Sequence, residues 1–393
     1  MKRVLVIAPD VPYPDDYGGA KDMWQRFQVL HEHGYRLSLV ATYKRTARRA
    51  AFEESSQSRI FEDVLLFPSS RWRGLATVRP YAVGSRRLRP AQVEQAAARF
   101  GARTFDAVEI EGLQAIDTFL GLRRRLRYGK ALVRPFNRES AYHLNQARSE
   151  SRLLRRALLR VDAARYHLLE RFGGWKRVVD TVLFISGEEI GHPSFADVKR
   201  RVLVRPVIPT RPPPALVNDF ARRENLLLYV GNLELADNRA AVRLAYRSLR
   251  ELLDRHDWRF ALCGRADDAG ILPDVRSDPR VSCAFNLTAD ELDRYYARAK
   301  VFACFSENRA GAKLKLFEPI LAGAPVVAND KAVAGSGLAS AVLLWDQSNA
   351  ASRERLVDLM TSAECWQAFR VAAYREWSTQ NESATAAYLR AFD

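Results

Sequence analysis

The stretch ENRAGAKLKLFEPILAGAPVVAND (307–330) joins a glycine-containing loop, a short helix and a buried strand. Pro319 lacks an amide hydrogen and is tolerated only in the first turn of a helix, so a helix is predicted to begin between Leu316 and Pro319. Gly323 and Ala324 allow this helix to pack closely before the apolar run PVVA, which predicts a strand. A loop, a helix and a buried strand in this order are typical of an α/β fold.

The same alternation runs through both halves of the chain. Strands are predicted at 3–9, 36–42, 105–112, 131–136, 178–186, 225–233, 258–264, 281–285, 300–306 and 324–330. Helices are predicted at 18–35, 149–172, 238–256 with Asp237 as the N-cap residue, 288–299, and from Ala363 onward. A proline cluster within 202–219 can continue neither a helix nor a central strand, and therefore predicts a linker.

A chain of 393 residues is too long for one ordinary core, so two domains are expected. We predict an α/β protein in which two Rossmann-like domains, residues 1–205 and 206–375, face a cleft. A C-terminal helix at about 376–393 is expected to return to the first domain. Open α/β sheets bind ligands at the carboxyl ends of their strands, so the functional site is expected there.

The net charge of +16 is unevenly distributed. Residues 1–200 contain 36 Lys and Arg against 22 Asp and Glu, whereas residues 201–393 contain 26 against 24. This asymmetry predicts an anionic partner for the first half, such as a membrane surface, a pyrophosphate-linked lipid or nucleic acid; an arginine-rich surface without a partner is the alternative. In segment 71–90, arginines alternate with Trp72 and Tyr81, a mixture that suits a membrane interface or a solvated basic loop.

The four cysteines are Cys263, Cys283, Cys304 and Cys365, and they form no CxxC pair. Three of them lie in or beside apolar runs, which favours packed thiols over metal ligands or disulfides and fits a reducing cytoplasm. The first apolar run, Val4 to Ala8, is too short for a signal peptide, and no run approaches the roughly 20 apolar residues that span a bilayer. We expect a cytoplasmic protein, peripheral on the inner face of the membrane if the basic segment binds lipid.

Lys315 and Glu318 are three residues apart and share one face of a helical turn. Lys315 can reach a diphosphate, and Glu318 can accept hydrogen bonds from a ribose diol. Arg309 precedes Gly311 and is placed to contact the phosphates, while the free amides at the start of the helix favour an anion. The alternative is a solvent-exposed Lys–Glu pair that contributes tenths of a kcal/mol.

The segment AGAKLKLFEPILAGAPVVA resembles a motif of retaining nucleotide-sugar glycosyltransferases of the GT-B fold, the family-4-like group. The resemblance implies that Lys315 binds phosphate, Glu318 binds ribose and Gly311 is the loop glycine. Ala310 stands where a related motif has its first glutamate. LLYVGNLELADNRAAV and the acceptor-side loop PYPDDYGGAKD, with Gly18 and Gly19, also resemble the group. The implied donor-binding residues are Gly231, Asn232, Arg265, Gly311, Ala312, Lys313, Leu314, Lys315 and Glu318.

The resemblance implies transfer of a sugar from a nucleoside diphosphate sugar to a hydroxyl of a glycan or lipid-linked acceptor, with retention, in surface polysaccharide or glycoconjugate biosynthesis. A UDP-sugar is expected ahead of a GDP- or dTDP-sugar, with no metal and no other cofactor. Lys315 and Arg309 would stabilise the leaving diphosphate, which itself would take the acceptor proton. If an enzyme base exists, the candidates are Glu111, Glu139 and His143.

Three other functions are considered. A GT-B-fold nucleotide-sugar epimerase would act within the cleft without an acceptor. A non-catalytic or nucleic-acid-binding protein would use the basic half, but no recognised nucleic-acid module is present, so no nucleic-acid partner is expected. A dinucleotide oxidoreductase is disfavoured because neither glycine turn has the GxGxxG spacing.

Overall fold

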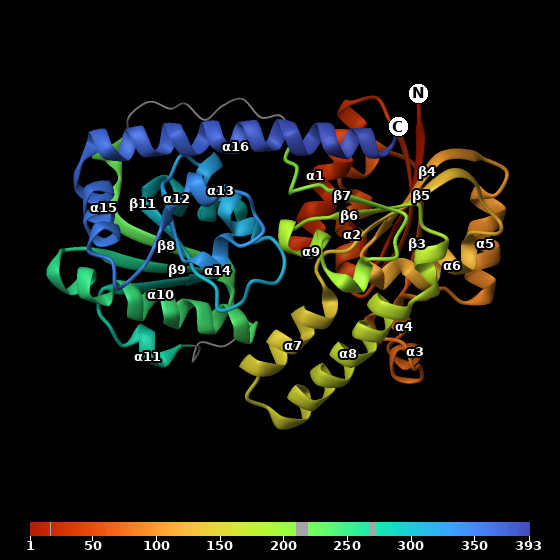
Figure 1. Cartoon of the computed structure of the whole chain (residues 1–393), viewed down its shortest axis with the longest axis horizontal. Helices are drawn as coiled ribbons and strands as arrows, with labels where there is room; N and C mark the ends of the chain where they lie inside the picture. The colour runs from red at the N-terminus through yellow and green to blue at the C-terminus, as the bar shows by residue number, and fades with distance from the viewer. Residues whose placement is uncertain (16, 210–218, 267–271) are drawn as a thin grey trace. The chain divides into compact units, whose positions relative to one another are not determined.

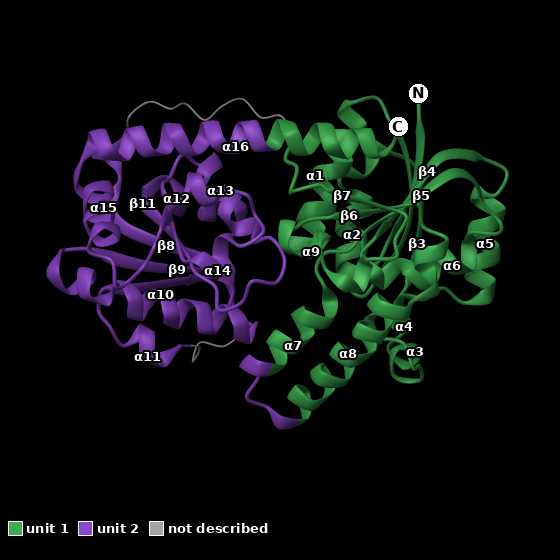
Figure 2. Ribbon diagram, viewed as in Figure 1, with its two compact units in different colours: residues 1–147, 154–210, 381–393 green, residues 148–153, 211–380 purple. Residues whose placement is uncertain are grey.

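The computed structural model describes residues 1–15, 17–209, 219–266 and 272–393, and it divides into two compact units (Figure 1, Figure 2). Unit 1 comprises residues 1–147, 154–210 and 381–393, and unit 2 comprises residues 148–153 and 211–380. The domain division predicted from the sequence placed its breaks at 205/206 and near 376. Part of the predicted linker, residues 210–218, lies outside the described residues.

Unit 1 is built on a seven-stranded parallel sheet in the order β3-β2-β1-β4-β5-β6-β7. Its strands are β1 (Arg3–Ala8), β2 (Arg36–Tyr43), β3 (Phe61–Pro68), β4 (Thr104–Glu111), β5 (Arg127–Arg134), β6 (Thr181–Phe184) and β7 (Arg200–Leu203). The helices between them are α1 (Gly18–Glu32), α2 (Thr46–Glu54), α3 (Arg71–Leu75), α4 (Tyr81–Arg86), α5 (Pro90–Phe100), α6 (Ile116–Leu122), α7 (Glu139–Ser149), α8 (Leu153–Phe172) and α9 (Gly187–Ile190).

Unit 2 is built on a six-stranded parallel sheet in the order β10-β9-β8-β11-β12-β13. Its strands are β8 (Glu224–Asn232), β9 (Arg259–Arg265), β10 (Val281–Phe285), β11 (Ala299–Cys304), β12 (Val326–Ala328) and β13 (Leu343–Leu344). Its helices are α10 (Ala236–Arg255), α11 (Pro273–Arg276), α12 (Ala289–Arg298), α13 (Phe317–Leu321), α14 (Asp330–Val333), α15 (Ala350–Thr361) and the first part of α16 (Ala363–Ala391).

Both strand orders follow the Rossmann pattern 3-2-1-4-5-6, with a seventh strand added in unit 1. The predicted α/β class and the two Rossmann-like domains are therefore confirmed. Every strand predicted from an apolar run is present. The sequence missed β3, whose first half carries Glu62 and Asp63, as well as the Arg-rich β7 and the two-residue β13.

Two helix predictions were wrong in detail. The helix predicted at 149–172 is two helices, because α7 ends at Ser149 and α8 begins at Leu153. Asp237 is not the N-cap of α10, since the residue before the helix is Leu235 and Asp237 lies in the first turn. An acidic side chain in the first turn still interacts favourably with the positive end of the helix dipole.

Alternating side chains on the unit 1 strands bury both faces of the sheet. In β1, Leu5 and Ile7 join one core cluster, while Val4 and Val6 join the other. The second cluster includes Tyr388 and other residues from the end of α16. The C-terminal part of this helix is therefore a component of unit 1, as the sequence predicted.

The strand order reverses between β1 and β4 in unit 1, and between β8 and β11 in unit 2. In open α/β sheets, ligands bind beyond the carboxyl ends of the strands at such reversals. In unit 2, two segments lie at this position: residues 231–235, which contain the last two residues of β8 and the loop after it, and residues 305–316, which follow β11. These segments contain most of the donor-binding residues predicted from the sequence.

Candidate functional site

Two glycines allow the carboxyl ends of β8 and β9 to lie in close contact. Gly231 is paired in register with Gly264, whose φ is +141°. A Cβ atom on Gly264 would lie 1.9 Å from the Gly231 carbonyl oxygen, which no side chain can tolerate. The Leu233 amide donates to the Arg265 carbonyl at 2.8 Å, so Gly231, Asn232 and Arg265 lie together at this edge.

The first turn of α10 holds the segment after β8 in place. Asn238 Nδ2 donates to the Asn232 carbonyl at 2.8 Å, and Arg239 Nη1 donates to the Leu233 carbonyl at 2.8 Å. Arg265 Nε donates to a Glu234 carboxylate oxygen at 3.2 Å. Arg239 therefore positions the loop backbone, and Arg265 lies at the adjacent strand end, next to the loop.

The loop after β11 turns at Gly311, whose φ of +66° favours glycine. Asn308 connects this loop to α10, because its Nδ2 donates to Asp237 Oδ2 at 3.1 Å. Lys313 Nζ donates to Asn308 Oδ1 at 2.9 Å and to the Ala310 carbonyl at 2.5 Å. Lys313 thus closes the loop onto itself, and half-buried Ala312 and Leu314 flank it.

Lys315 follows this loop and lies at the reversal between β8 and β11. Its Nζ donates to the Tyr229 hydroxyl at 3.0 Å and to the Phe305 carbonyl at 3.3 Å, and it lies 4.6 Å from the centre of the Tyr229 ring. Burial disfavours the charged ammonium, but interactions with Tyr229 and Cys304 outweigh burial and raise the pKa of Lys315. The site therefore holds a positioned positive charge.

The predicted helix start is confirmed: a 3-10 turn, Leu314–Leu316, leads into α13, and Pro319 lies in the first turn. On this helix, Glu318 accepts a hydrogen bond from the Tyr296 hydroxyl at 3.0 Å. Both Lys315 and Glu318 are half-buried rather than solvent-exposed. Lys315 and Glu318 therefore do not form the solvent-exposed pair that was the alternative interpretation.

Arg309 extends from the same loop toward the end of β12. Its Nη2 lies 2.5 Å from Asp330 Oδ2, in an ion pair whose side chains are both exposed. Asp330 begins α14, which directly follows β12. Arg309 therefore lies at the rim of the site rather than beside Lys315 in its interior.

Sequence reasoning did not identify four residues that shape this site: Tyr229, Asp237 as a partner of Asn308, Tyr296 and Asp330. Tyr229 carries a hydroxyl inside an otherwise apolar strand, which was the available signal. Asp330 follows a buried strand at its carboxyl end, where ligand-contacting residues gather. The partner of Tyr296, by contrast, is 22 positions away in the chain, and no local pattern indicates it.

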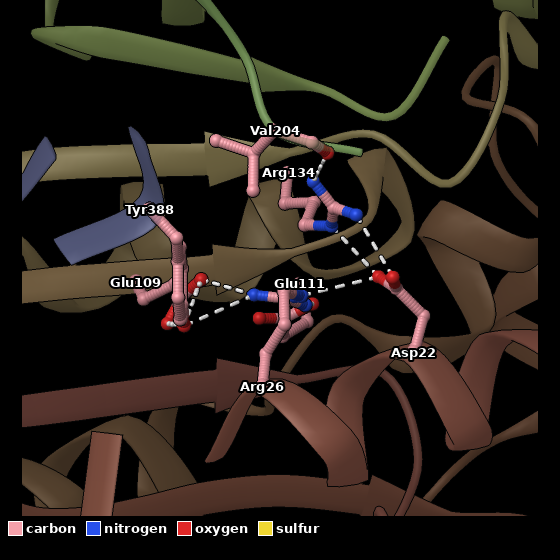
Figure 3. A network of polar contacts seen from close by, with 7 residues as sticks. All are labelled: Asp22, Arg26, Glu109, Glu111, Arg134, Val204 and Tyr388. Atoms are coloured by element: carbon pink, nitrogen blue, oxygen red, sulfur yellow. Dashed lines mark hydrogen bonds and ion pairs between the residues drawn. The ribbon is translucent and has the colours of Figure 1, made fainter. Parts of the chain in front are cut away.

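Glu111, one of the candidate bases, lies in a buried polar network of unit 1 (Figure 3). Its Oε2 accepts a hydrogen bond from Arg26 Nη2 at 2.5 Å, and burial raises its pKa. The network also contains Asp22, Glu109, Arg134 and Tyr388. The structure thus places Glu111 in the core, where it is fully covered.

The other two candidate bases, Glu139 and His143, lie one turn apart on α7. Glu139 is 3% exposed, and burial raises its pKa to about 8. The His143 ring stacks on Tyr166 with ring centres 5.0 Å apart, and burial lowers the pKa of His143. Glu139 Oε1, His143 Nδ1 and the Tyr166 hydroxyl have no hydrogen-bond partner among the described residues. The structure therefore brings these two candidates together.

The predicted acceptor-side glycines open α1. A Cβ atom on Gly19 would lie 3.1 Å from the Tyr17 ring and 3.7 Å from the Phe136 ring. Tyr17 is tied to the loop after β1, because its hydroxyl donates to Asp10 at 3.3 Å. Gly18 is the first residue of α1, and Gly19 allows the start of the helix to pack closely against the Tyr17 and Phe136 rings. Within the described ranges, no group of three or more His, Cys, Asp or Glu side chains is arranged to hold a metal ion.

Comparisons with known proteins agree with this geometry. Residues 224–361 match the family model described as "Glycosyl transferases group 1". None of the curated proteins compared with the chain matches it in sequence.

Several solved structures share the fold at low sequence identity. TarM has a TM-score of 0.68 and 7% identity, covering 100% of this chain and 99% of its own. An α,α-trehalose-phosphate synthase from Burkholderia vietnamiensis has a TM-score of 0.59 and 13% identity, with coverages of 100% and 98%. HepE from Anabaena has a TM-score of 0.58 and 13% identity, with both coverages at 98%.

The matched segment contains the paired glycines, the Gly311 loop, Lys315 and Glu318. The structural similarity extends over both units rather than over this segment alone. A group 1 domain in unit 2 and the GT-B fold over the full chain together identify this protein as a glycosyltransferase of the GT-B fold.

Proposed function

We propose that this glycosyltransferase uses a nucleoside diphosphate sugar, with UDP as the favoured nucleotide, and transfers the sugar to a hydroxyl of a glycan or lipid-linked acceptor. Two structural relatives support UDP by their descriptions: HepE was solved with UDP, and the trehalose-phosphate synthase is described as UDP-forming. Surface polysaccharide or glycoconjugate biosynthesis is the proposed setting.

The position of Lys315 is the observation that carries the donor proposal. Cleavage of the bond between sugar and diphosphate places new negative charge on the leaving group. A prearranged cation at that point stabilises the transition state more than the ground state. Lys315 is held by Tyr229 and the Phe305 carbonyl before any ligand arrives, so little reorganisation is needed. We propose that Glu318, which accepts a hydrogen bond from the Tyr296 hydroxyl, also accepts hydrogen bonds from the ribose.

The donor proposal is tested by thermal stabilisation of the purified protein with UDP, GDP, dTDP, CDP and ADP. We expect UDP to stabilise the wild type, and Lys315→Ala and Glu318→Ala to abolish this effect. Lys331→Ala is the matched control, because Lys331 is an exposed lysine on α14 of the same unit. Absence of stabilisation by all five nucleotides in the folded wild type would contradict the proposal.

We further propose retention of anomeric configuration without a resident metal. In this reaction the leaving phosphate accepts the proton of the acceptor hydroxyl, and Lys315 compensates the charge. NMR of the first product, before any mutarotation, reports its anomeric configuration directly. Product with the configuration opposite to that of the donor would overturn retention.

Peripheral attachment to an anionic membrane is the third part of the proposal. Trp72 and Leu75 lie on α3 and Val78 lies in the segment after it; the three are 79%, 64% and 90% exposed, and Arg71, Arg73 and Arg79 are their neighbours in the sequence. Exposed apolar groups flanked by basic residues are typical of interfacial segments. No helix in the described parts of the chain is both long and apolar enough to cross a membrane.

Helix α8 extends this surface. Its residues Leu154, Leu158, Val161, Leu168 and Phe172 are exposed and recur at steps of three, four or seven, so they share one face. The α3–α4 segment is joined to this helix, because the Tyr81 amide donates to Asp162 Oδ1 at 3.0 Å. The apolar stripe and its neighbouring arginines match an anionic lipid surface in chemistry.

Vesicle sedimentation tests this attachment. Vesicles containing phosphatidylglycerol are expected to bind the protein at low salt, pure phosphatidylcholine vesicles to bind it weakly, and added salt to release it. The double variant Trp72→Ser, Leu158→Ser should bind several-fold less. Leu144→Ser, at an exposed leucine on α7, is the control. Failure of the wild type to bind anionic vesicles at low salt would overturn the attachment.

A further inference from the structure

Backbone hydrogen bonds bring three basic residues together at the carboxyl edge of the unit 1 sheet. The Ser69 amide donates to the Tyr43 carbonyl at 2.9 Å, and the Ser70 amide donates to the Ser85 carbonyl at 2.8 Å. Each of the three basic residues comes directly after one of these hydrogen-bonded residues in the sequence. They are Lys44 after β2, Arg71 at the start of α3 and Arg86 at the end of α4, and we refer to them as the basic cluster.

Arg86 is oriented by backbone oxygens rather than by carboxylates. Its Nε donates to the Pro9 carbonyl at 2.8 Å, and its Nη1 donates to the Ala82 carbonyl at 3.2 Å. Neutral carbonyl partners fix the guanidinium without neutralising it, and the carboxyl groups that interact with its charge, Asp10 and Glu139, form no hydrogen bond to it. Because Pro9 directly follows β1, Arg86 is anchored at the strand end beside the reversal between β1 and β4.

Lys44 and Arg71 are exposed, and neither side chain has a bonded partner within the described part of the chain. Asp10 attracts Lys44 electrostatically, but it is already engaged by Arg48 Nε at 3.6 Å and by the Val11 amide at 2.9 Å. The three cations of the cluster therefore lie near one carboxylate, Asp10, which already interacts with Arg48 and the Val11 amide.

The titration of Lys44 reflects this crowding of like charges. The pKa of Lys44 is lowered to about 8, mainly by repulsion from Arg86 and next by burial. Repulsion from Arg71 and Arg45 lowers the pKa further, whereas attraction by Asp10 raises it. Like charges held this close destabilise the folded protein unless an anion neutralises them. Cation clusters of this kind at a strand-end edge are functional-site candidates.

We propose that the basic cluster of Lys44, Arg71 and Arg86 binds a phosphate group carried by the acceptor. The inference rests on the proposed glycosyltransfer, because it assigns the acceptor a chemical class: a phosphorylated sugar or a phosphate-linked lipid. Arginine forks and lysine ammonium groups are the usual ligands of phosphate oxygens, and a phosphate offers enough acceptor oxygens for all three side chains. The donor diphosphate has its own cation in unit 2, so the two phosphate sites do not compete.

The experiment measures phosphate binding in the full-length protein with the donor site disabled by Lys315→Ala. The probes are glucose 1-phosphate in solution and farnesyl diphosphate, titrated by calorimetry, so that a soluble and a lipid phosphate source are distinguished. We expect at least one probe to bind, and Lys44→Gln or Arg71→Gln to weaken it at least tenfold. Arg87→Gln is the control, because Arg87 is an exposed arginine next to the cluster.

Both variants replace exposed side chains, so they should fold, and Lys44→Gln should raise the thermal midpoint at pH 7 by removing repulsion. Binding of neither probe, or equal binding in all variants, would overturn the proposal. UDP stabilisation of the wild type and of Lys44→Gln is measured in parallel and should be the same in both. If UDP does not stabilise the wild type, the donor proposal is overturned, whereas the phosphate titrations still decide the proposal for the basic cluster.

Discussion

The hydroxyl of Tyr229 sets the position and the charge of Lys315. Tyr229→Phe removes the oxygen that accepts from Lys315 Nζ at 3.0 Å but keeps the buried ring that packs in the core. Loss of one such hydrogen bond is worth about 0.5–1.5 kcal/mol. We therefore expect the Kd for UDP to rise by about two- to twelvefold, measured by calorimetry, with little change in thermal stability.

Tyr246→Phe is the control for this prediction. Tyr246 lies on α10 of the same unit, and its hydroxyl donates to Asp278 at 2.8 Å, away from the loop that holds Lys315. This variant should leave UDP affinity unchanged. Equal affinity in Tyr229→Phe and the wild type would show that Lys315 is positioned without the hydroxyl.

At the scale of secondary-structure elements, the paired ends of β8 and β9 leave no room for a side chain at position 264. In Gly264→Ala, the new methyl group meets the Gly231 carbonyl oxygen, and the positive φ is strained for alanine. Overpacking costs about 1–3 kcal/mol and a strained backbone adds a similar amount, so unit 2 should be severely destabilised. Calorimetric unfolding measures the loss. Gly191→Ala is the control, because no atom lies within 4 Å of its added Cβ.

The end of α16 is attached to unit 1 by a buried tyrosine. The Tyr388 hydroxyl donates to Glu109 Oε2 at 2.8 Å and accepts from Arg26 Nη1 at 3.2 Å (Figure 3). Tyr388→Phe leaves this buried carboxylate with one donor fewer, which costs about 1–3 kcal/mol. A lower thermal midpoint is expected. Tyr374→Phe, whose hydroxyl bonds to no described residue, should unfold at the wild-type temperature.

For the complete chain, buried glutamates predict a stability that falls with rising pH. Burial raises the pKa of Glu139 to about 8 and that of Glu170 to about 7, from an ordinary value of 4.5. Above pH 4.5 the folded protein keeps protons that the unfolded chain has released. The stability these groups contribute is therefore fully present below about pH 4.5 and is lost as the pH rises through 7 to 8.

Glu139→Gln keeps the neutral form at every pH and should flatten this decline. One group contributes about 1.4 kcal/mol per pH unit between its unfolded and folded pKa values. Urea unfolding at pH 5.5, 7.0 and 8.5 measures the slope, with Glu32→Gln at an exposed position on α1 as the control. Equal slopes in Glu139→Gln and the wild type would contradict the assignment of Glu139 as a buried proton carrier.

Much of the fold could be predicted from local patterns. Apolar runs marked the central strands, and Pro319 located the start of α13 to within two residues. The strands that escaped prediction are those whose stability comes from neighbours: β7 carries two arginines, and β13 has two residues and pairs with β12. Such edge elements lack a periodic signal because their burial is set by what packs against them.

The candidate site divides in the same way. Lys315, Glu318 and Gly311 were identified from spacing, because residues three apart on a helical turn and a glycine in a tight loop are local features. The hydrogen-bond partners of these residues were not identified from the sequence. Tyr229 is 86 positions from Lys315, and the hydrogen bond from Asn308 to Asp237 joins residues 71 apart.

The sequence determines which segments become strands and helices, and which residue types gather at each strand end, because these depend on periodicity, proline and glycine within short stretches. Tertiary structure decides which side chains meet. The basic cluster exists only because parallel pairing sets β1, β2 and β3 side by side and backbone hydrogen bonds then join residues 43, 69, 70 and 85. Charge–charge interaction depends on distance in space rather than along the chain, so the environments of Lys315, Lys44 and Glu139 arise only on folding.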